Sequence, residues 1–242
     1  MDLFDSALAL PSPNTPLAER MRPKTLEEFE GQQEVVGPGT PLHTAVINDE
    51  VPSLMLWGPP GTGKTTLARI IANMTKARFV PFSAVGGSVK DVREIILQAE
   101  NDRKYYKRKT ILFVDEIHRF NKAQQDAFLP SVENGTITLI GATTENPSFA
   151  VNGALLSRSR VIVLKQLEPE SIVSILKRAI NDKELGLGKE NVTIENDALE
   201  LLANFSSGDA RSALNTLDLA VKTATSPSPS LVRRGNATEP ES

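Results

Sequence analysis

Cysteine is absent from this chain, and its absence excludes several kinds of chemistry at once. Without thiols there is no disulfide framework, no thiolate nucleophile and no zinc site built on cysteine ligands. Long apolar runs are absent too: none approaches the roughly 18 residues that span a bilayer. Residues 1–12 also lack the basic region and apolar stretch of a secretory signal. We therefore expect an intracellular, cytoplasmic protein with no membrane partner.

A large excess of charge of either sign is also missing. The 242 residues include 27 Lys and Arg against 30 Asp and Glu, a net charge of -3. Any binding of nucleic acid would therefore need a local basic patch. With 40% apolar and 24% charged residues, the composition excludes collagen-like, wholly disordered and coiled-coil proteins.

Short apolar runs alternate with helical patterns through the middle of the chain. Helical spacing of apolar residues is clear in 67–74 and 92–99. The expected strands are 54–57, 78–82, 111–114, 137–142 and 161–164. Strands that alternate with helices predict an α/β fold with a doubly wound, parallel five-stranded sheet.

The chain beyond this alternation divides into further regions. After 18–165, the α/β domain, only helical patterns follow, at 170–181, 195–205 and 209–223, which predicts a small helical domain over 166–224. Proline and asparagine residues that disfavour regular structure predict a flexible leader over 1–17. The Ser/Pro-rich residues 225–242 predict a disordered tail.

A glycine-rich loop follows the first expected strand and fits the pattern G-x-x-x-x-G-K-[ST]. It consists of Gly58, Pro59, Pro60, Gly61, Thr62, Gly63, Lys64 and Thr65, with Thr66 next in the following helix. Backbone N–H groups and a helix N-terminus in this setting bind polyphosphate. Lys64 would reach the β- and γ-phosphates and Thr65 would bind Mg²⁺, so ATP and Mg²⁺ are the expected cofactors. The alternative is an ordinary strand–helix turn.

Two carboxylates, Asp115 and Glu116, directly follow the third expected strand. We expect Asp115 to hold Mg²⁺ and Glu116 to act as the general base toward water. The alternative is a helix cap. His118 follows closely. A metal site would need further ligands, and His43 is the only other histidine, so an ordinary polar helix residue is favoured over a signalling or substrate contact.

The segment 103–109, RKYYKRK, carries five cations and two aromatic residues. Phosphate contacts and base stacking there would suit single-stranded DNA, although a solvated connector is favoured. Leu3 and Phe4 loosely resemble short peptides that dock on bacterial sliding clamps, and accidental apolar residues in a leader are the favoured alternative.

Together the motifs resemble those of the AAA+ ATPases of the clamp-loader-like group. More narrowly, they resemble the replication-associated recombination protein A family, also called maintenance of genome stability protein A and similar to Werner helicase-interacting protein. The resemblance covers about residues 16–224. The segments that carry it are ERMRPKTLEEFEGQ at 19–32, GPPGTGKT at 58–65, FVDEIHRFNKAQQDAFLPSVE at 113–133, GATTENPS at 141–148, LSRSR at 156–160 and GDARSALN at 208–215.

The resemblance implies two roles at the γ-phosphate. Thr143 matches the sensor 1 position, with Thr144 as the alternative. Arg158 matches an arginine finger that acts on the nucleotide of a neighbouring subunit, and Arg160 is the alternative residue for this role. The structural alternative for either arginine is a surface ion pair.

The resemblance also implies roles for residues around the rest of the nucleotide, including its adenine ring. Arg211 matches sensor 2 on a helical lid, while 22–24 with Val35 and Val36 match the segment lining the adenine site. Ser83 matches a polar residue that can hold the catalytic glutamate in an inactive pose.

The implied function is a DNA-dependent ATPase in replication fork maintenance, recombination and DNA repair, which couples ATP hydrolysis to remodelling at DNA ends or gaps. Expected partners are DNA, a single-stranded DNA-binding protein and replisome components, with a nucleoid-associated location and homo-oligomers in the family. A Holliday-junction branch-migration motor, a clamp-loader-type subunit and a nucleotide-dependent scaffold are the alternatives. Family members continue into a C-terminal oligomerisation domain, whereas the matching pattern here stops near Ala224, so we expect a truncated chain that assembles poorly.

Overall fold

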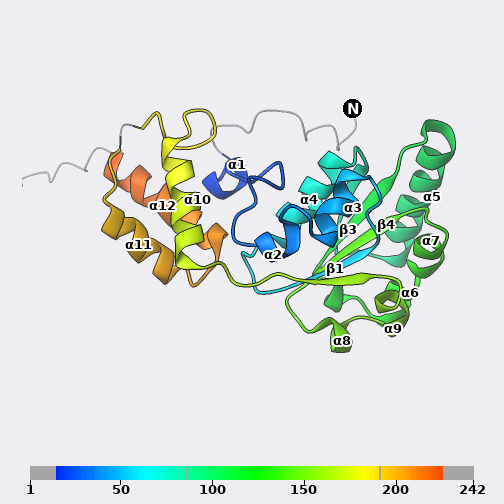
Figure 1. Cartoon of the computed structure of the whole chain (residues 1–242). Helices are drawn as coiled ribbons and strands as arrows, with labels where there is room; N and C mark the ends of the chain where they lie inside the picture. The colour runs from blue at the N-terminus through cyan, green and yellow to red at the C-terminus, as the bar shows by residue number, and fades with distance from the viewer. Residues whose placement is uncertain (1–14, 85–86, 191, 226–242) are drawn as a thin grey trace, which may run out of the picture.

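Five parallel strands form the centre of the structure, a computed structural model that describes residues 15–84, 87–190 and 192–225 (Figure 1). Their order in the sheet is β2-β3-β4-β1-β5. The strands are β1 Leu54–Trp57, β2 Arg78–Ser83, β3 Thr110–Asp115, β4 Thr138–Thr143 and β5 Arg160–Val163. The prediction of a doubly wound, parallel five-stranded sheet is confirmed. Leu3 and Phe4, most of the predicted leader and the tail from 226 lie outside the described residues.

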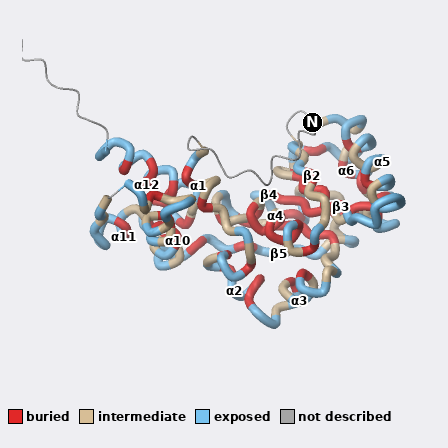
Figure 2. Tube along the Cα trace, turned by 90° about the horizontal axis from the view of Figure 1, so that it is seen from above, coloured by how far each residue is buried: buried red, intermediate tan, exposed pale blue. Residues whose placement is uncertain are grey.

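Helices cover both faces of this sheet. They are α2 Gln33–Val36, α3 Pro41–Ile47, α4 Lys64–Met74, α5 Val89–Tyr106, the 3-10 turn η2 Ile117–Arg119, α6 Lys122–Asp126, α7 Leu129–Glu133, α8 Pro147–Ala150 and α9 Gly153–Leu156. Successive residues of β1 enter different cores: Leu54 and Leu56 pack with α4, whereas Met55 packs with Val92 of α5. The three inner strands β3, β4 and β1 are therefore buried on both sides (Figure 2), whereas the edge strands β2 and β5 are partly exposed.

The carboxyl ends of the strands extend beyond their apolar runs. β2, β3 and β4 end at Ser83, Asp115 and Thr143, each one residue later than its apolar run predicts. Ser83 pairs with Asp115 in the ladder, and Trp57 pairs with Thr143. Backbone pairing thus continues through these polar residues, and it fixes the positions of their Cα atoms at the edge of the sheet.

The second body contains three longer helices, α10 Pro169–Asn181, α11 Asn196–Phe205 and α12 Ala210–Thr225. The short helix α1, Leu17–Arg20, packs with them although it precedes the sheet in the chain (Figure 1). Leu17 and Met21 belong to the same buried cluster as Leu176 and Leu217. The N-terminal segment therefore completes the core of the helical body.

Two backbone segments connect the bodies and are bonded to each other. The buried side chain of Gln32 donates to the carbonyl oxygen of Lys165 at 2.7 Å and accepts from its N–H at 3.1 Å. A Cβ on Gly31 would lie 2.4 Å from a methyl of Leu167, so the two segments are also in close contact. Among the described residues, no helix combines the length and apolar character that crossing a membrane requires.

Candidate active site

A cavity of about 400 Å³ opens where the carboxyl edge of the sheet faces the helical body. Its walls come from the N-terminal segment 16–30, the loop 60–66, the ends of β3 and β4, and helices α10 and α12. Ligands of doubly wound sheets bind at this edge. The topology therefore brings the predicted phosphate loop, acidic pair and helical lid to one place.

The glycines of the loop allow contacts that a side chain would block. Gly61 has φ +73° and Gly63 has φ +93°, both in the left-handed region. A Cβ would lie 2.0 Å from Oδ1 of Asp209 at Gly61, and 2.6 Å from the ring of Phe29 at Gly63. The loop can follow this path against both bodies only with glycine at these positions.

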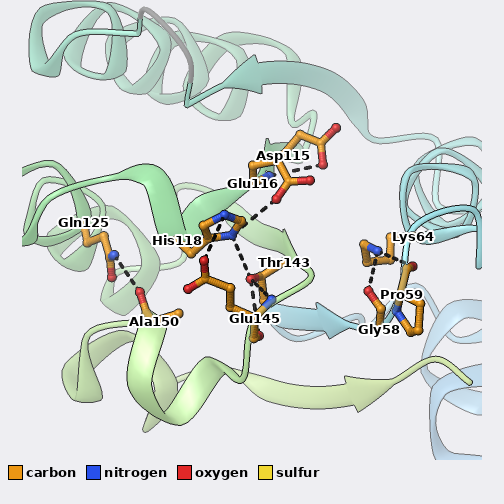
Figure 3. Close-up of polar contacts among 10 residues, drawn as sticks. All are labelled: Gly58, Pro59, Lys64, Asp115, Glu116, His118, Gln125, Thr143, Glu145 and Ala150. Atoms are coloured by element: carbon orange, nitrogen blue, oxygen red, sulfur yellow. Dashed lines mark hydrogen bonds and ion pairs between the residues drawn. The ribbon is translucent and has the colours of Figure 1, made fainter.

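Lys64 is buried at the start of α4, and its Nζ donates to the carbonyl oxygens of Gly58 at 2.6 Å and Pro59 at 2.7 Å (Figure 3). Burial lowers the pKa of this ammonium, and the nearby carboxylates of Glu116 and Asp115 oppose that effect only in part. Its described hydrogen bonds go to carbonyl groups rather than to a carboxylate. The loop thus holds a buried cation that an anionic ligand would stabilise.

The other loop residues divide between the cavity wall and the structure behind it. Gly58 and Pro59 act as acceptors for Lys64 and do not line the cavity. The residues of the loop that do line it are Pro60, Gly61, Thr62, Gly63, Lys64, Thr65 and Thr66.

Arg22 joins the N-terminal segment to the loop helix. Its Nη1 donates to Oγ1 of Thr66 at 2.8 Å, and its other nitrogens bind the carboxylate of Glu19, which also pairs with Arg69 at 2.6 Å. Burial alone would raise the pKa of Glu19, but the hydrogen bonds and charges of the two arginines lower it below its usual value. A charged network therefore holds one wall of the cavity.

Asp115 and Glu116 border the cavity as predicted. Asp115 is the last residue of β3, and its Oδ1 accepts from the N–H of Glu116 at 3.2 Å. Glu116 adopts a left-handed conformation, with φ 52° and ψ 48°, which costs a non-glycine residue about 1–2 kcal/mol. This conformation ends the strand and turns Glu116 into the cavity wall.

His118 lies in η2 and contacts the predicted catalytic residues (Figure 3). Its Nδ1 is 2.9 Å from Oγ1 of Thr143 and 3.3 Å from Oε2 of Glu116, and its Nε2 is 3.6 Å from Oε1 of Glu145. His118 lies in a short helical turn and does not line the cavity, as an ordinary polar helix residue would, but its side chain also contacts Glu116 and Thr143. Sequence spacing missed the contact because it depends on β3 and β4 lying side by side.

Thr143 and Thr144 have different environments. Thr143 is fully buried, and its hydroxyl lies 3.0 Å from the N–H and 3.3 Å from the carbonyl oxygen of Glu145. Thr144 is exposed and lines the cavity. Of the two candidates for sensor 1, Thr144 is therefore the one that borders the cavity, whereas the hydroxyl of Thr143 is engaged by Glu145 and His118.

Val35 and Val36 do not border the cavity, so their predicted contribution to an adenine site stays a prediction. Val36 is buried in the sheet core and Val35 packs against that core, because α2 turns its apolar side inward. Arg22 and Pro23 from the same predicted segment do line the cavity. Its apolar wall instead includes Met21, Phe29, Leu167, Ile175 and Leu214.

The two predicted arginines lie in different places. Arg211, in the first turn of α12, lines the cavity, and its charge contributes to the lowered pKa of Lys64. Arg158 follows α9 outside the cavity and pairs with Glu133 at 2.7 Å. In the single chain Arg158 thus forms the surface ion pair that was its structural alternative, and its action on a neighbouring subunit stays a prediction. Arg160 begins β5 and is exposed.

The donors at the cavity suit a magnesium ion that shares its ligands with a nucleotide. Thr65 offers a hydroxyl and Asp115 a carboxylate. In the part of the chain that the structure describes, no group of three or more His, Cys, Asp or Glu side chains could hold a metal by itself. Mg²⁺ is commonly held by one or two protein oxygens, phosphates and water, so the residues fit this ion.

Comparison with known sequences assigns both bodies to known families. Residues 54–167 match the ATPase family associated with various cellular activities (AAA), and residues 188–239 match the AAA C-terminal domain. The chain is 53% identical to replication-associated recombination protein A of Haemophilus influenzae over 86% of its own length. It is 48% identical to ATPase WRNIP1 of Dictyostelium discoideum, again over 86% of the chain.

The aligned regions cover 47% of the Haemophilus protein and 23% of the Dictyostelium protein, so the chain spans at most about half the length of these relatives. Among solved structures, the RuvB Holliday junction branch migration motor of Thermotoga maritima superposes with a TM-score of 0.67 and is 32% identical, covering 82% of this chain and 64% of that one. Sequence, sheet order and cavity agree: the chain belongs to the AAA ATPase family, within the group of replication-associated recombination protein A and WRNIP1.

Proposed function

We propose that this chain is the nucleotide-hydrolysing part of a DNA-dependent ATPase of replication fork maintenance, recombination and repair, which couples hydrolysis to remodelling at DNA ends or gaps. The observation that carries the proposal is the cavity that brings Lys64, Asp115, Glu116 and Arg211 together. The names of the relatives support the DNA-related role.

Each residue at the cavity has a role in hydrolysis that follows from its position. Lys64 would leave its two carbonyl partners for the phosphates of ATP, and Thr65 with Asp115 would hold Mg²⁺. Bound Mg²⁺ supplies neutralisation of charge on the β- and γ-phosphates. Glu116 would orient water and accept its proton, while Thr144 would contact the γ-phosphate and Arg211 would bring the helical body over the nucleotide.

Turnover measurements with and without single-stranded DNA test this proposal. We expect phosphate release from ATP that requires Mg²⁺ and increases with DNA, with light scattering recording the assembly state of each sample. A chain that binds ATP but shows no hydrolysis at any assembly state would contradict the enzyme assignment and favour a nucleotide-dependent scaffold.

Branch migration is the second candidate because RuvB has a similar fold. The relatives of higher identity include several replication-associated recombination proteins and are not named as branch-migration motors, which favours the first candidate. Comparing stimulation by a four-way junction with stimulation by a gapped duplex separates the two, and stronger stimulation by the junction would favour branch migration.

Assembly is tested through Arg158. Replacing Arg158 with alanine should leave ATP binding intact and lower turnover tenfold or more, because Arg158 lies outside its own cavity and would act across a subunit interface. Mixing this variant with a Lys64→Ala chain should partly restore turnover, since each chain supplies what the other lacks. Loss of ATP binding in the Arg158 variant would overturn the assignment.

The basic segment supports a DNA contact through both charge and exposed aromatic rings. Tyr105 and Tyr106 are 67% and 75% exposed, and Nζ of Lys104 lies 5.3 Å from the ring centre of Tyr105. Lys109 pairs with Asp49 at 2.8 Å, and Arg103 donates to the carbonyl oxygen of Asn134 at 2.9 Å. The charges available to phosphates are therefore chiefly those of residues 104, 107 and 108.

Changing Lys104, Lys107 and Arg108 together to glutamate should weaken binding of single-stranded DNA and reduce its dependence on salt, because fewer counterions are released. Fluorescence anisotropy across a salt series measures both. The matched control changes the exposed lysines of the helical body, Lys177, Lys183 and Lys189, to glutamate. Equal loss in both variants, or no loss in the first, would contradict a DNA contact at this segment.

A cytoplasmic, nucleoid-associated location and contacts with a single-stranded DNA-binding protein and replisome components belong to the same proposal. They rest on the names of the relatives and on the proposed DNA substrate.

A further inference from the structure

We propose that His118 is a positioning residue that holds the Glu116 carboxylate and ties it to the end of β4. The inference rests on the proposed ATP hydrolysis and adds a residue that the phosphate-loop and acidic-pair motifs do not include. His118 occupies the first full turn after Glu116, and its side chain is only 12% exposed.

The contacts of Thr143 and Glu116 together indicate which nitrogen of His118 carries a proton. The Thr143 hydroxyl donates to the Glu145 carbonyl oxygen at 3.3 Å and accepts from the Glu145 N–H at 3.0 Å. With the hydroxyl proton directed to Glu145, a lone pair of Oγ1 faces Nδ1 of His118 at 2.9 Å, and Nδ1–H is then the donor there. This tautomer is inferred from the network of partners.

The position of Glu116 leads to the same tautomer. Its Oε2 lies 3.3 Å from Nδ1 of His118, and an unprotonated Nδ1 would set a nitrogen lone pair against a carboxylate. One N–H is therefore shared between Glu116 and Thr143. This N–H fixes the orientation of a carboxylate that the left-handed backbone at Glu116 has turned into the cavity wall.

The consequence for catalysis is a rigid base next to the γ-phosphate sensor. Glu116 follows β3, Thr143 ends β4, and Thr144 continues from β4 into the cavity wall. His118 joins these two strand ends on the side away from the nucleotide, because it does not itself line the cavity. It would thus affect the rate of hydrolysis through Glu116 and leave nucleotide binding alone.

Kinetics of substituted chains test this role. His118→Ala should lower kcat about tenfold to hundredfold and leave the Kd for ATP within about twofold of the parent value. His118→Asn should recover much of kcat, because its side-chain amide can donate toward Glu116 and Thr143. The control is His43→Ala, which removes the other histidine, on α3, and should change neither quantity. Unchanged kcat in His118→Ala, an equal loss of ATP binding, or no recovery in His118→Asn would overturn the proposal.

Nitrogen NMR of the imidazole rings tests the contact without requiring hydrolysis. The sequence has only two histidines, so His43→Ala assigns the His118 signals directly. We expect a protonated Nδ1 whose resonance shifts in Glu116→Gln and in Thr143→Val. An unprotonated Nδ1, or no response to either substitution, would overturn the inference even if ATP turnover is normal. The expected signals in a chain without turnover would support the contact while contradicting the proposed function.

Discussion

Replacing Lys64 with alanine should abolish ATP binding, with a loss of affinity of about 100-fold or more. Lys64 is the buried cation of the loop, and its described hydrogen bonds go to the carbonyl oxygens of Gly58 and Pro59, not to a carboxylate. Truncating a buried charged partner of an ion pair costs about 2–5 kcal/mol. Titration of a fluorescent ATP analogue measures the effect directly.

The control for this substitution is Lys90→Ala, which removes an exposed lysine of α5 from a weak pair with Glu94. It should leave affinity unchanged. Thermal unfolding of both variants shows whether the fold is retained, which matters because Lys64→Ala leaves two loop carbonyls without their donor. Wild-type affinity in a folded Lys64→Ala chain would contradict the assignment of the phosphate loop.

The second large effect is expected from Glu116→Gln. This change keeps the size of the side chain and removes the group that accepts a proton from water, so kcat should fall by about 10²–10⁴-fold. Nucleotide affinity should persist, because the phosphates are bound by the loop and not by this carboxylate. Single-turnover hydrolysis alongside ATP binding separates the two quantities.

Glu145→Gln is the matched control for Glu116. Glu145 is also a carboxylate near His118, with Oε1 at 3.6 Å from Nε2, but it is 63% exposed and does not line the cavity. It should retain most of the turnover. If the two substitutions lowered kcat equally, Glu116 would not be the base.

The sequence predicted those parts of the site whose residues are neighbours along the chain. The phosphate loop and acidic pair each lie between an expected strand and the next turn, and the structure places both at the cavity. The apolar runs located all the strands, but the ends at Ser83, Asp115 and Thr143 were missed, because ladder pairing continues after the side chains become polar.

The relations that the sequence did not predict concern which way a side chain points and which residues meet across the fold. Val36 was expected at the base of the nucleotide, but α2 directs it into the core. Thr143 and Thr144 are adjacent in sequence, yet one is buried and the other borders the cavity. The contact between His118 and Thr143 joins residues 25 positions apart, one in the turn η2 that follows β3 and the other at the end of β4. Residue type and spacing do not determine these relations.

The bonded pair of connections at Gln32 and Lys165 affects how the helical body can move. A domain joined by one segment can swing and twist, whereas this body is joined by two segments that the Gln32 amide holds together. Two attachments side by side resist twisting about either segment, and the rotation they oppose least is bending about the line that joins them. Arg211 and the loop at Lys64 both line the cavity, on the helical body and on the sheet domain respectively. A hinge rotation of the helical body would therefore open or close the cavity. The two connections would prevent the helices from sliding sideways across the nucleotide.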